Sequence, residues 1–364
     1  MEQEQSCRIR RSHRWYFYAG LVLLIVALLA GGFLAFLTVT EYRPQPREDA
    51  LTGGCAAGSV PEDGRLRILS FNIGYGGLDA SEDFLMDGGS GVGAEDQDTV
   101  EGNLDGIRQI LTDAEADAYL LQEVDLDSSR TFHINELEVF RQALPDHGWY
   151  FAPNYRCPFV PYPLQHPIGS IHSGLTTYTR FPVTQAQRIS LPVPFSWPIR
   201  TANLKRCLLT TRIPVEQTGK ELVLVNLHLE AYDNGEGKIA QTEQLLGLLQ
   251  EEYGKGNYVI AGGDFNQIFP GSTHEIKSTS HWIPGFLEPL PRELEGWQYA
   301  FDDSVPTCRL LNQPYDPESP LNQHYLLDGF ILSPNVALES VQTLDCGFAY
   351  SDHNPVLLEA VLLP

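Results

Sequence analysis

Polar side chains stand at the ends of several apolar, strand-like segments of this sequence. The run "VIAGGD" ends on Asp264, with Asn266 shortly after it, and "VLVNLH" ends on His228. The same pattern adds Asn72 after "ILSF", Glu123 in "YLLQEV", Asp328 at the start of "DGFIL", and Asp352 and His353 before "NPVLLE". A turn residue or a hydrogen-bonded core histidine would explain any one of them alone. Together they indicate a site, because each buried polar group must be hydrated, paired or used in chemistry.

The residue types favour metal-assisted hydrolysis. The oxygen donors of Asn72, Glu123 and Asp352 suit a hard cation, Mg²⁺ with Mn²⁺ as the alternative. Histidines and a further aspartate suit general acid–base catalysis. The sequence contains no GxSxG nucleophile motif, no Walker-type phosphate loop and no HExxH zinc helix. Serine-hydrolase and zinc-protease chemistry therefore has no support.

The elements that must position these residues are mostly strands. Helical patterns cover only 99–116 and 238–254, whereas strand-like runs recur from residue 65 to the C-terminus. Many strands flanked by a few helices favour a layered α/β domain over a βαβ repeat. We expect one such domain at 64–364. The acidic, glycine-rich segment 79–105 is predicted to be a long excursion, either a solvated loop or the rim of a site.

The first 63 residues have a different character. A basic tail at 1–14 precedes an uncharged, apolar run at 15–40, and a segment with three prolines and several glycines follows at 41–63. The run is longer than the core of a cleavable signal peptide, so it predicts a retained, single-pass membrane anchor. The positive-inside rule places the N-terminus in the cytoplasm and the main domain outside the cell membrane. We expect 41–63 to be a linker.

Charge and cysteine content limit the partners. The formal net charge is −23, which repels a polyanion and so disfavours nucleic acid. None of the six cysteines forms a CxxC pair, so a zinc knuckle is not expected.

In this order the motifs resemble those of the endonuclease/exonuclease/phosphatase superfamily. The segments that carry the resemblance are "LSFNI", "LLQEVD", "VNLHLE", "GGDFN" and "SDHNPV". The resemblance implies a four-layer α/β sandwich with two packed mixed β-sheets, preceded by the transmembrane helix. Glu123 is then the principal magnesium ligand, and Asn72 and Asp352 support it.

The resemblance also implies catalytic roles. Asp264 would orient or deprotonate the attacking water, and Asn266 would hold a phosphate oxygen. His353, oriented by Asp328, would bind the same phosphate. His228 corresponds to a general acid or phosphate-binding histidine.

Three functions follow from this reading. The first is a magnesium-dependent phosphodiesterase that acts outside the cytoplasm on a phospholipid head group or a small phosphorylated molecule, with the membrane as partner through the N-terminal helix. The second is an extracellular DNA or RNA nuclease, which the net charge disfavours. The third is a non-catalytic surface binding module with the same fold, which the intact set of polar residues disfavours.

Some residues have two interpretations. Arg130, Arg156, Arg180 and Arg309 would either hold phosphates or form structural salt bridges, and we expect salt bridges. Trp197 would either pack beneath a loop or contact lipid, and we expect packing.

Overall fold

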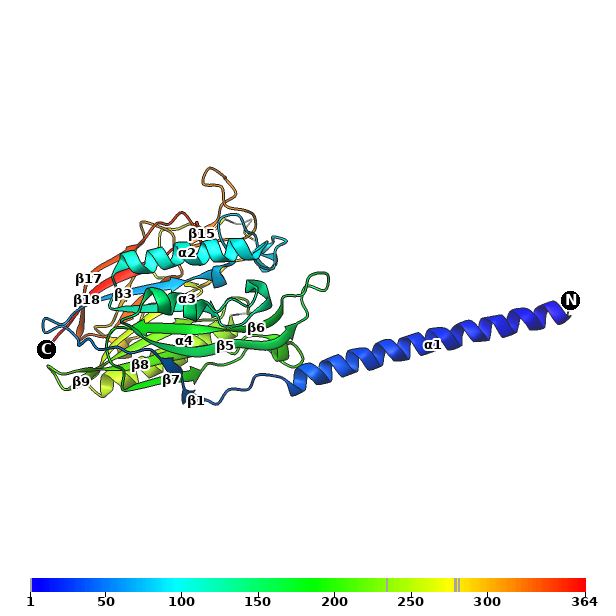
Figure 1. The fold of residues 1–364 in the computed structure, drawn as a ribbon, viewed down its shortest axis with the longest axis horizontal. Helices are drawn as coiled ribbons and strands as arrows, with labels where there is room; N and C mark the ends of the chain where they lie inside the picture. The colour runs from blue at the N-terminus through cyan, green and yellow to red at the C-terminus, as the bar shows by residue number, and fades with distance from the viewer. Residues whose placement is uncertain (1, 234, 278–279, 281) are drawn as a thin grey trace.

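One long helix stands apart from the folded domain. The computed structural model describes residues 2–233, 235–277, 280 and 282–364. Helix α1 (Glu2–Val39) projects away from the domain, and the segment Trp15–Val39 is long and apolar enough to span a membrane (Figure 1). Among the described residues it is the one helix that meets this criterion.

Two seven-stranded sheets form the body of the domain. The first contains β2 (Leu51–Gly53), β3 (Arg65–Asn72), β4 (Ala118–Asp125), β5 (Gly148–Val160), β6 (Gly169–Thr179), β17 (Val336–Thr343) and β18 (Val356–Leu362), in the order β17-β18-β3-β4-β6-β5-β2. The second contains β1 (Arg47–Asp49), β7 (Gln185–Ser190), β8 (Cys207–Val215), β9 (Lys220–His228), β10 (Tyr258–Asp264), β13 (Gln298–Ala300) and β16 (Asp328–Leu332), in the order β1-β7-β8-β9-β10-β16-β13.

Helices cover the outer faces of both sheets. The amphipathic helices α2 (Gln97–Ala114) and α3 (Glu136–Ala143) pack on the first sheet, and α4 (Glu236–Gly254) packs on the second (Figure 1). Asp96 caps α2 by accepting a hydrogen bond from the Thr99 amide at 2.9 Å. The predicted four-layer sandwich with two mixed sheets is therefore confirmed.

Short elements fill the connections between the layers. Two small ladders pair β11 (Gln267–Ile268) with β12 (Gly285–Phe286), and β14 (Cys308–Arg309) with β15 (His324–Tyr325). Single 3₁₀ turns occur at η1 (Gly74–Gly76), η2 (Leu85–Asp87), η3 (Ser129–Thr131), η4 (Ile199–Ala202) and η5 (Arg292–Leu294).

The core between the sheets is apolar, and polar side chains link the two sheets near the site. Alternate residues of the facing strands fill it, among them Leu66, Ile68, Leu120, Leu222, Leu224 and Ile260. The Gln122 amide of β4 donates to the Asn226 oxygen of β9 at 2.8 Å. Asn226 in turn donates to the carbonyls of Leu121 and Thr176. These bonds satisfy buried polar groups and fix one sheet against the other.

The segment predicted to be a linker is part of the domain. Within 41–63, β1 pairs with β7 at the edge of the second sheet, and β2 pairs with β5 at the edge of the first. A proline-containing segment tolerates this position because an edge strand needs only one row of ladder bonds. The chain that follows α1 is therefore attached to both sheets.

Strand direction brings the polar strand ends to one end of the sandwich. β3 runs parallel to β4, and β9 runs parallel to β10, so each sheet brings two strand carboxyl ends together. The 3.1 Å bond from Asn72, at the end of β3, to Asp264, at the end of β10, puts both pairs at the same end of the sandwich. β16 and β18 run antiparallel to their neighbours and therefore begin at that end. The register aligns Asp264 with both His228 and Asp328 across β9, β10 and β16.

Candidate active site

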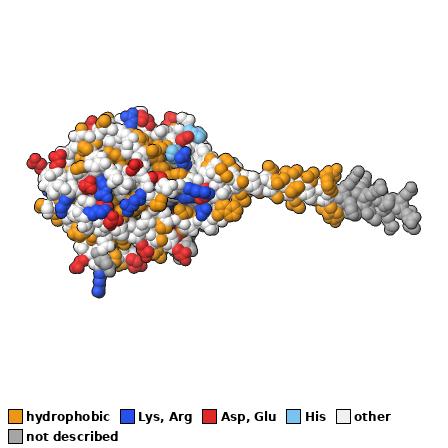
Figure 2. Space-filling view, turned by 90° about the horizontal axis from the view of Figure 1, so that it is seen from below, with side chains coloured by type: hydrophobic (Ala, Val, Ile, Leu, Met, Phe, Trp, Pro, Cys, Tyr) orange, Lys and Arg blue, Asp and Glu red, His pale blue; other side chains and the backbone are white. Residues whose placement is uncertain are grey.

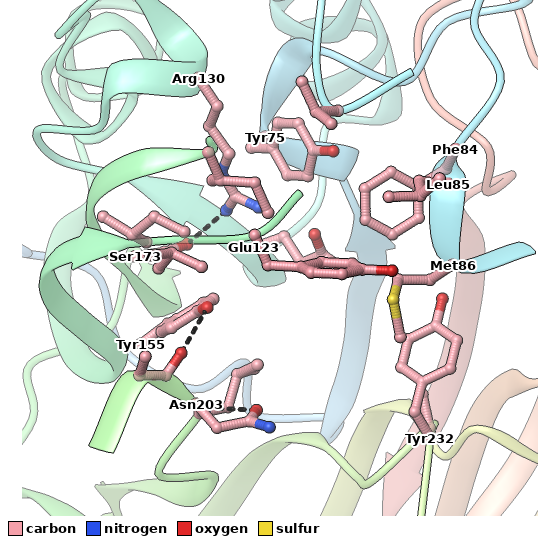
Figure 3. A pocket seen from close by; sticks show the side chains of 18 of the residues that line it. Tyr75, Phe84, Leu85, Met86, Glu123, Arg130, Tyr155, Ser173, Asn203 and Tyr232 are labelled. Carbon is pink, nitrogen blue, oxygen red and sulfur yellow. Dashed lines mark hydrogen bonds between the residues drawn. The ribbon is translucent and has the colours of Figure 1, made fainter. Parts of the chain in front are cut away.

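The strand ends open into a cavity of about 700 Å³. The predicted catalytic and metal-ligand residues line it, except Asp328; those that line it are Asn72, Glu123, His228, Asp264, Asn266, Asp352 and His353. Asp328 is buried directly behind His353. Figure 3 shows part of the lining, with Phe84, Met86 and Tyr232 on one side and Tyr155 and Asn203 on the other.

Asn72 occupies the centre of the polar floor. Its amide nitrogen lies 3.1 Å from Glu123 Oε1 and 3.1 Å from Asp264 Oδ2, while its oxygen accepts from the Gly74 amide at 3.1 Å. In this geometry Asn72 presents a donor to the carboxylates. The structure thus shows it linking Glu123 to Asp264, and its predicted role as a metal ligand stays a prediction.

His353 and Asp328 form a tightly bonded pair. His353 Nδ1 lies 2.8 Å from Asp328 Oδ2, and both side chains are buried. Burial opposes protonation of the imidazole, but the negative charges of Asp328 and Asp352 and the hydrogen bond to Asp328 outweigh it, and the pKa of His353 is raised well above its usual range. Its Nε2 points toward Asp264, with Oδ2 at 3.8 Å. The pair therefore holds a cationic donor at the cavity floor.

Asp264 and His228, unlike His353, both tend toward their uncharged forms. Burial first, and then repulsion from Asp328, raise the pKa of Asp264 to about 7. Burial, with the positive charges of Arg206 and His353, lowers the pKa of His228 well below its usual value. His228 Nε2 lies 3.4 Å from Asp264 Oδ2. Near neutral pH the site therefore contains a carboxyl group able to gain or lose a proton beside a neutral imidazole.

The donor set fits a divalent cation. Burial raises the pKa of Asp352 to about 6, and Glu123 adds to the increase because its charge faces the same space. Among the described residues, two clusters have ligand atoms within 4.8 Å of one another: Asp264, Asp328 and His353, and Cys308, Asp352 and His353. Glu123 belongs to neither cluster but lines the same cavity. Carboxylates that repel one another in a buried site are neutralised by a hard cation. Glu123 and Asp352 are the residues that would hold it.

Strained backbone coincides with the cavity. Tyr75, Glu123 and Asn266 have φ values of 44°, 58° and 50°, and all three line the cavity. Left-handed conformations of non-glycine residues are costly and concentrate at functional sites. At Asn266 the strained turn lets the backbone amide donate to Asp264 Oδ1 at 2.8 Å, while the side chain donates to the Leu229 carbonyl at 3.0 Å.

Two lining residues were not predicted from the sequence. The Tyr75 hydroxyl is buried and has no hydrogen-bond partner among the described residues, and the Arg130 guanidinium lies 3.5 Å from the centre of its ring. Arg206 pairs with Glu230 at 3.3 Å and donates to the His228 carbonyl at 3.2 Å. The "NIGYGG" context hints at Tyr75, because it lies three residues after Asn72. Arg206 gives no sequence signal.

The acidic segment 79–105 forms a wall of the cavity. Phe84, Leu85 and Met86 line it, and Arg309 fixes the segment by donating to the carbonyls of Asp79 and Glu82 at 2.6 and 3.0 Å. The rim interpretation is therefore the one that the structure supports. Arg309 holds the chain, rather than standing free to bind phosphate.

Other interpretations have mixed outcomes. Arg130 forms a salt bridge with Asp125 at 2.9 Å, and Arg180 forms one with Asp117 at 3.3 Å, as expected. The prediction that Trp197 packs beneath a loop was wrong, because its side chain is 52% exposed. Its indole donates to the Thr38 hydroxyl at 3.0 Å, at the end of α1.

Comparison with known proteins decides the family. Residues 69–353 match the model of the Endonuclease/Exonuclease/phosphatase family. The chain belongs to this family. Members of the Endonuclease/Exonuclease/phosphatase family are generally hydrolases, phosphoesterases and nucleases among them, and the site described above occupies the matched region. No curated protein matches the chain in sequence.

Solved structures of the Endonuclease/Exonuclease/phosphatase family share the fold. One from Beutenbergia cavernae has a TM-score of 0.54 at 16% identity, covering 82% of this chain and 72% of its own. One from Bacteroides vulgatus has a TM-score of 0.51 at 16% identity, covering 82% of this chain and 99% of its own. One from Leptotrichia buccalis has a TM-score of 0.51 at 15% identity, covering 81% and 99%. At these identities the likeness establishes the fold alone.

Proposed function

We propose that the protein is a divalent-cation-dependent phosphodiesterase that hydrolyses a phospholipid head group or a small phosphorylated molecule. The observation that carries the proposal is that a proton acceptor, Asp264, and a protonated donor, His353, lie side by side on the cavity floor. Asp328 keeps His353 protonated, and Asp264, whose pKa is raised to about 7, lies 3.8 Å from it. Hydrolysis of a phosphodiester needs both a proton acceptor for water and a cationic donor for the phosphate oxygens.

Each residue then has a defined task. Asp264 accepts a proton from the attacking water, and the Asn72 amide holds its carboxylate in place. The protonated His353 donates to a phosphate oxygen and stabilises the charge that develops there. A bound Mg²⁺ would be held by Glu123 and Asp352 and would supply charge neutralisation at the phosphate. Neutral His228 is placed to donate or accept a proton near the leaving group.

Charge and lining favour a substrate with few phosphates. The three arginines that line the cavity bind protein groups: Arg130 binds Asp125, Arg206 binds Glu230, and Arg309 binds backbone carbonyls. The chain also has a net charge of −23. A polyanion such as DNA would meet little positive potential here, so nuclease activity is the alternative that the assay must test.

The location is also part of the proposal. Arg8, Arg10, Arg11 and Arg14 precede the apolar segment Trp15–Val39. The positive-inside rule then keeps the N-terminus in the cytoplasm and the catalytic domain outside it, with Mg²⁺ or Mn²⁺ as the cation.

The test compares the full-length chain with its Asp264→Ala form in detergent micelles. The substrates are bis-p-nitrophenyl phosphate, phosphatidylcholine micelles, plasmid DNA and p-nitrophenyl phosphate, each with Mg²⁺ and with EDTA. The control is Asp63→Asn, because Asp63 is exposed and, within the described part of the chain, pairs only with Arg65 at the surface. We expect Mg²⁺-dependent diester hydrolysis that falls about 10²–10⁴-fold in Asp264→Ala and is unchanged in the control.

Other results would contradict the proposal in distinct ways. Preferential cleavage of plasmid DNA would make the protein a nuclease. Mg²⁺ binding without turnover of any substrate would favour a non-catalytic binding module. Equal turnover by the wild type and Asp264→Ala would show that the site lies elsewhere.

A further inference from the structure

The end of α1 is packed against the catalytic domain. Leu37 is only 4% exposed and joins a cluster with Cys157, Val160 and Ile171 of strands β5 and β6. One turn earlier, the Phe33 ring meets Phe159 edge to face at 6.1 Å. These contacts bury apolar surface that a freely hinged anchor would leave exposed.

Polar contacts fix the same junction. Glu41, whose side chain is 3% exposed, lies 3.3 Å from Arg200 and 3.6 Å from Lys205. The Trp197 indole donates to the Thr38 hydroxyl at 3.0 Å. The domain therefore has a defined orientation relative to the axis of α1.

The catalytic cavity reaches this junction. Phe33, Leu34 and Leu37 of α1 line the same cavity as Glu123 and Asp264. The intervening wall is largely apolar, and its members are Val160, Pro161, Ile168, Pro198, Ile199 and Ala202. The cavity thus combines a charged floor with an apolar side that ends on the membrane helix.

The apolar side lies at the level where a bilayer would end. A helix rises about 1.5 Å per residue and the hydrocarbon core is about 30 Å thick, so about 20 residues cross it. The span begins at Trp15, and Tyr16 and Tyr18 beside it suit the membrane interface. Counting from Trp15, the far edge of the hydrocarbon falls at about residue 35. This is the level of the cavity wall formed by Phe33, Leu34 and Leu37.

Exposed apolar side chains lie on the two segments that contact the end of α1: the β5–β6 loop, which begins after Val160 and includes Ile168, and the residues around η4, which include Ala202. Leu164 is 83% exposed, Ile199 62%, Tyr162 55% and Trp197 52%. In Figure 2 the hydrophobic colour of the helix continues onto the end of the domain that faces it. A large exposed apolar patch marks a membrane or protein interaction site, and its continuity with a membrane-spanning helix favours the bilayer. We define these four residues as the rim.

We propose that the rim lies in the bilayer that α1 spans, and that the cavity takes its substrate from that bilayer. The substrate is then a phospholipid whose phosphodiester reaches the strand-end site while an acyl chain lies along the wall formed by α1, β5 and η4. This deepens the proposed function and rests on it for the chemistry. The apolar wall accounts for the chain, and the charged floor accounts for the head group. A free amphiphile taken from solution is the competing source.

The first experiment reads membrane contact without activity. The full-length chain carrying Trp15→Phe is placed in nanodiscs whose phosphatidylcholine is brominated at shallow acyl positions. We expect quenching of tryptophan fluorescence, and we expect most of that quenching to disappear when Trp197→Phe is added. Unchanged quenching on adding Trp197→Phe, or no quenching at all, would overturn the placement of the rim. This result does not depend on the protein being an enzyme.

The second experiment reads the route of the substrate. Leu164→Glu and a control, Leu363→Glu, are compared in phosphatidylcholine nanodiscs; Leu363 is 40% exposed and lies at the C-terminal end, away from α1 (Figure 1). We expect Leu164→Glu to lower bilayer lipid hydrolysis by about tenfold, because it removes the apolar surface of one leucine from the bilayer. Turnover of bis-p-nitrophenyl phosphate should be unchanged. The control should change neither rate.

The remaining outcomes are distinguishable. Equal loss on both substrates would mean that Leu164 supports the fold, and undiminished bilayer hydrolysis in Leu164→Glu would mean that lipid does not enter at the rim. Either result overturns the inference. If no form hydrolyses any diester, the proposed function fails, whereas the quenching experiment still decides whether the rim is in the membrane.

Discussion

The bond between His353 and Asp328 gives the most exacting prediction. Asp328→Asn keeps the size of the side chain but removes the negative charge that stabilises the buried imidazolium of His353, whose Nδ1 lies 2.8 Å from Asp328 Oδ2. A hydrogen bond to a charged group contributes about 1.5–3 kcal/mol. If that energy is realised at the transition state, turnover falls by about 10- to 150-fold, since 1.36 kcal/mol corresponds to a factor of ten.

The pH profile should move in a defined direction. Asp328 raises the pKa of His353, so the protonated donor persists into the alkaline range in the wild type. Without that charge the pKa falls, and the alkaline limb of activity should shift to lower pH. The assay is hydrolysis of bis-p-nitrophenyl phosphate at saturating Mg²⁺ from pH 5 to 10, with Asp63→Asn as the control. Turnover within twofold of the wild type and an unmoved alkaline limb would refute the role assigned to the pair.

Three further predictions concern stability. The folded-state pKa values of Asp264 and Asp352, about 7 and about 6, exceed the ordinary value of 3.8. The stability that these protonated carboxyl groups give is therefore present below pH 4 and is lost as the pH rises through 7. Because the ionised carboxylates bind Mg²⁺, Mg²⁺ should raise Tm more at pH 8 than at pH 5 in calorimetry, and an equal rise would count against the site. Asn226→Leu removes three buried hydrogen bonds, one from Gln122 and two to the carbonyls of Leu121 and Thr176. It should lower the free energy of unfolding by about 2–3 kcal/mol in urea titrations, and a change below 0.5 kcal/mol would show that the link is dispensable. Arg309→Lys weakens the bonds to Asp79 and Glu82 and should speed limited proteolysis within 79–96, whereas an unchanged cleavage pattern would mean that other contacts hold the segment.

The site could be predicted from the sequence because its polar residues stand at the ends of strands. A strand that closes on a polar residue is unusual enough to read directly, and parallel neighbours must bring such ends to one edge. This made Glu123, Asp264 and His228 predictable without knowledge of their contacts. The orientation of Asn72 was not predictable, because which amide atom faces Glu123 depends on the turn at Gly74.

The relation of α1 to the domain was not predictable for a physical reason. Leu37 reads as one more apolar residue of a membrane segment, and Glu41 reads as the start of a linker. Their partners, Val160 and Arg200, are more than a hundred residues away in sequence, and no local pattern links them. The same holds for Trp197, whose hydrogen-bond partner Thr38 is also more than a hundred residues away in sequence.

The most direct test of the central claim is the dependence of turnover on both the cation and Glu123. The full-length wild type and its Glu123→Gln form are stripped with EDTA, and hydrolysis of bis-p-nitrophenyl phosphate is followed as Mg²⁺ is added back. The account predicts that the wild type loses activity on chelation and recovers it with Mg²⁺, and that Glu123→Gln recovers little or none. Turnover that survives chelation, or full recovery in Glu123→Gln, would contradict it.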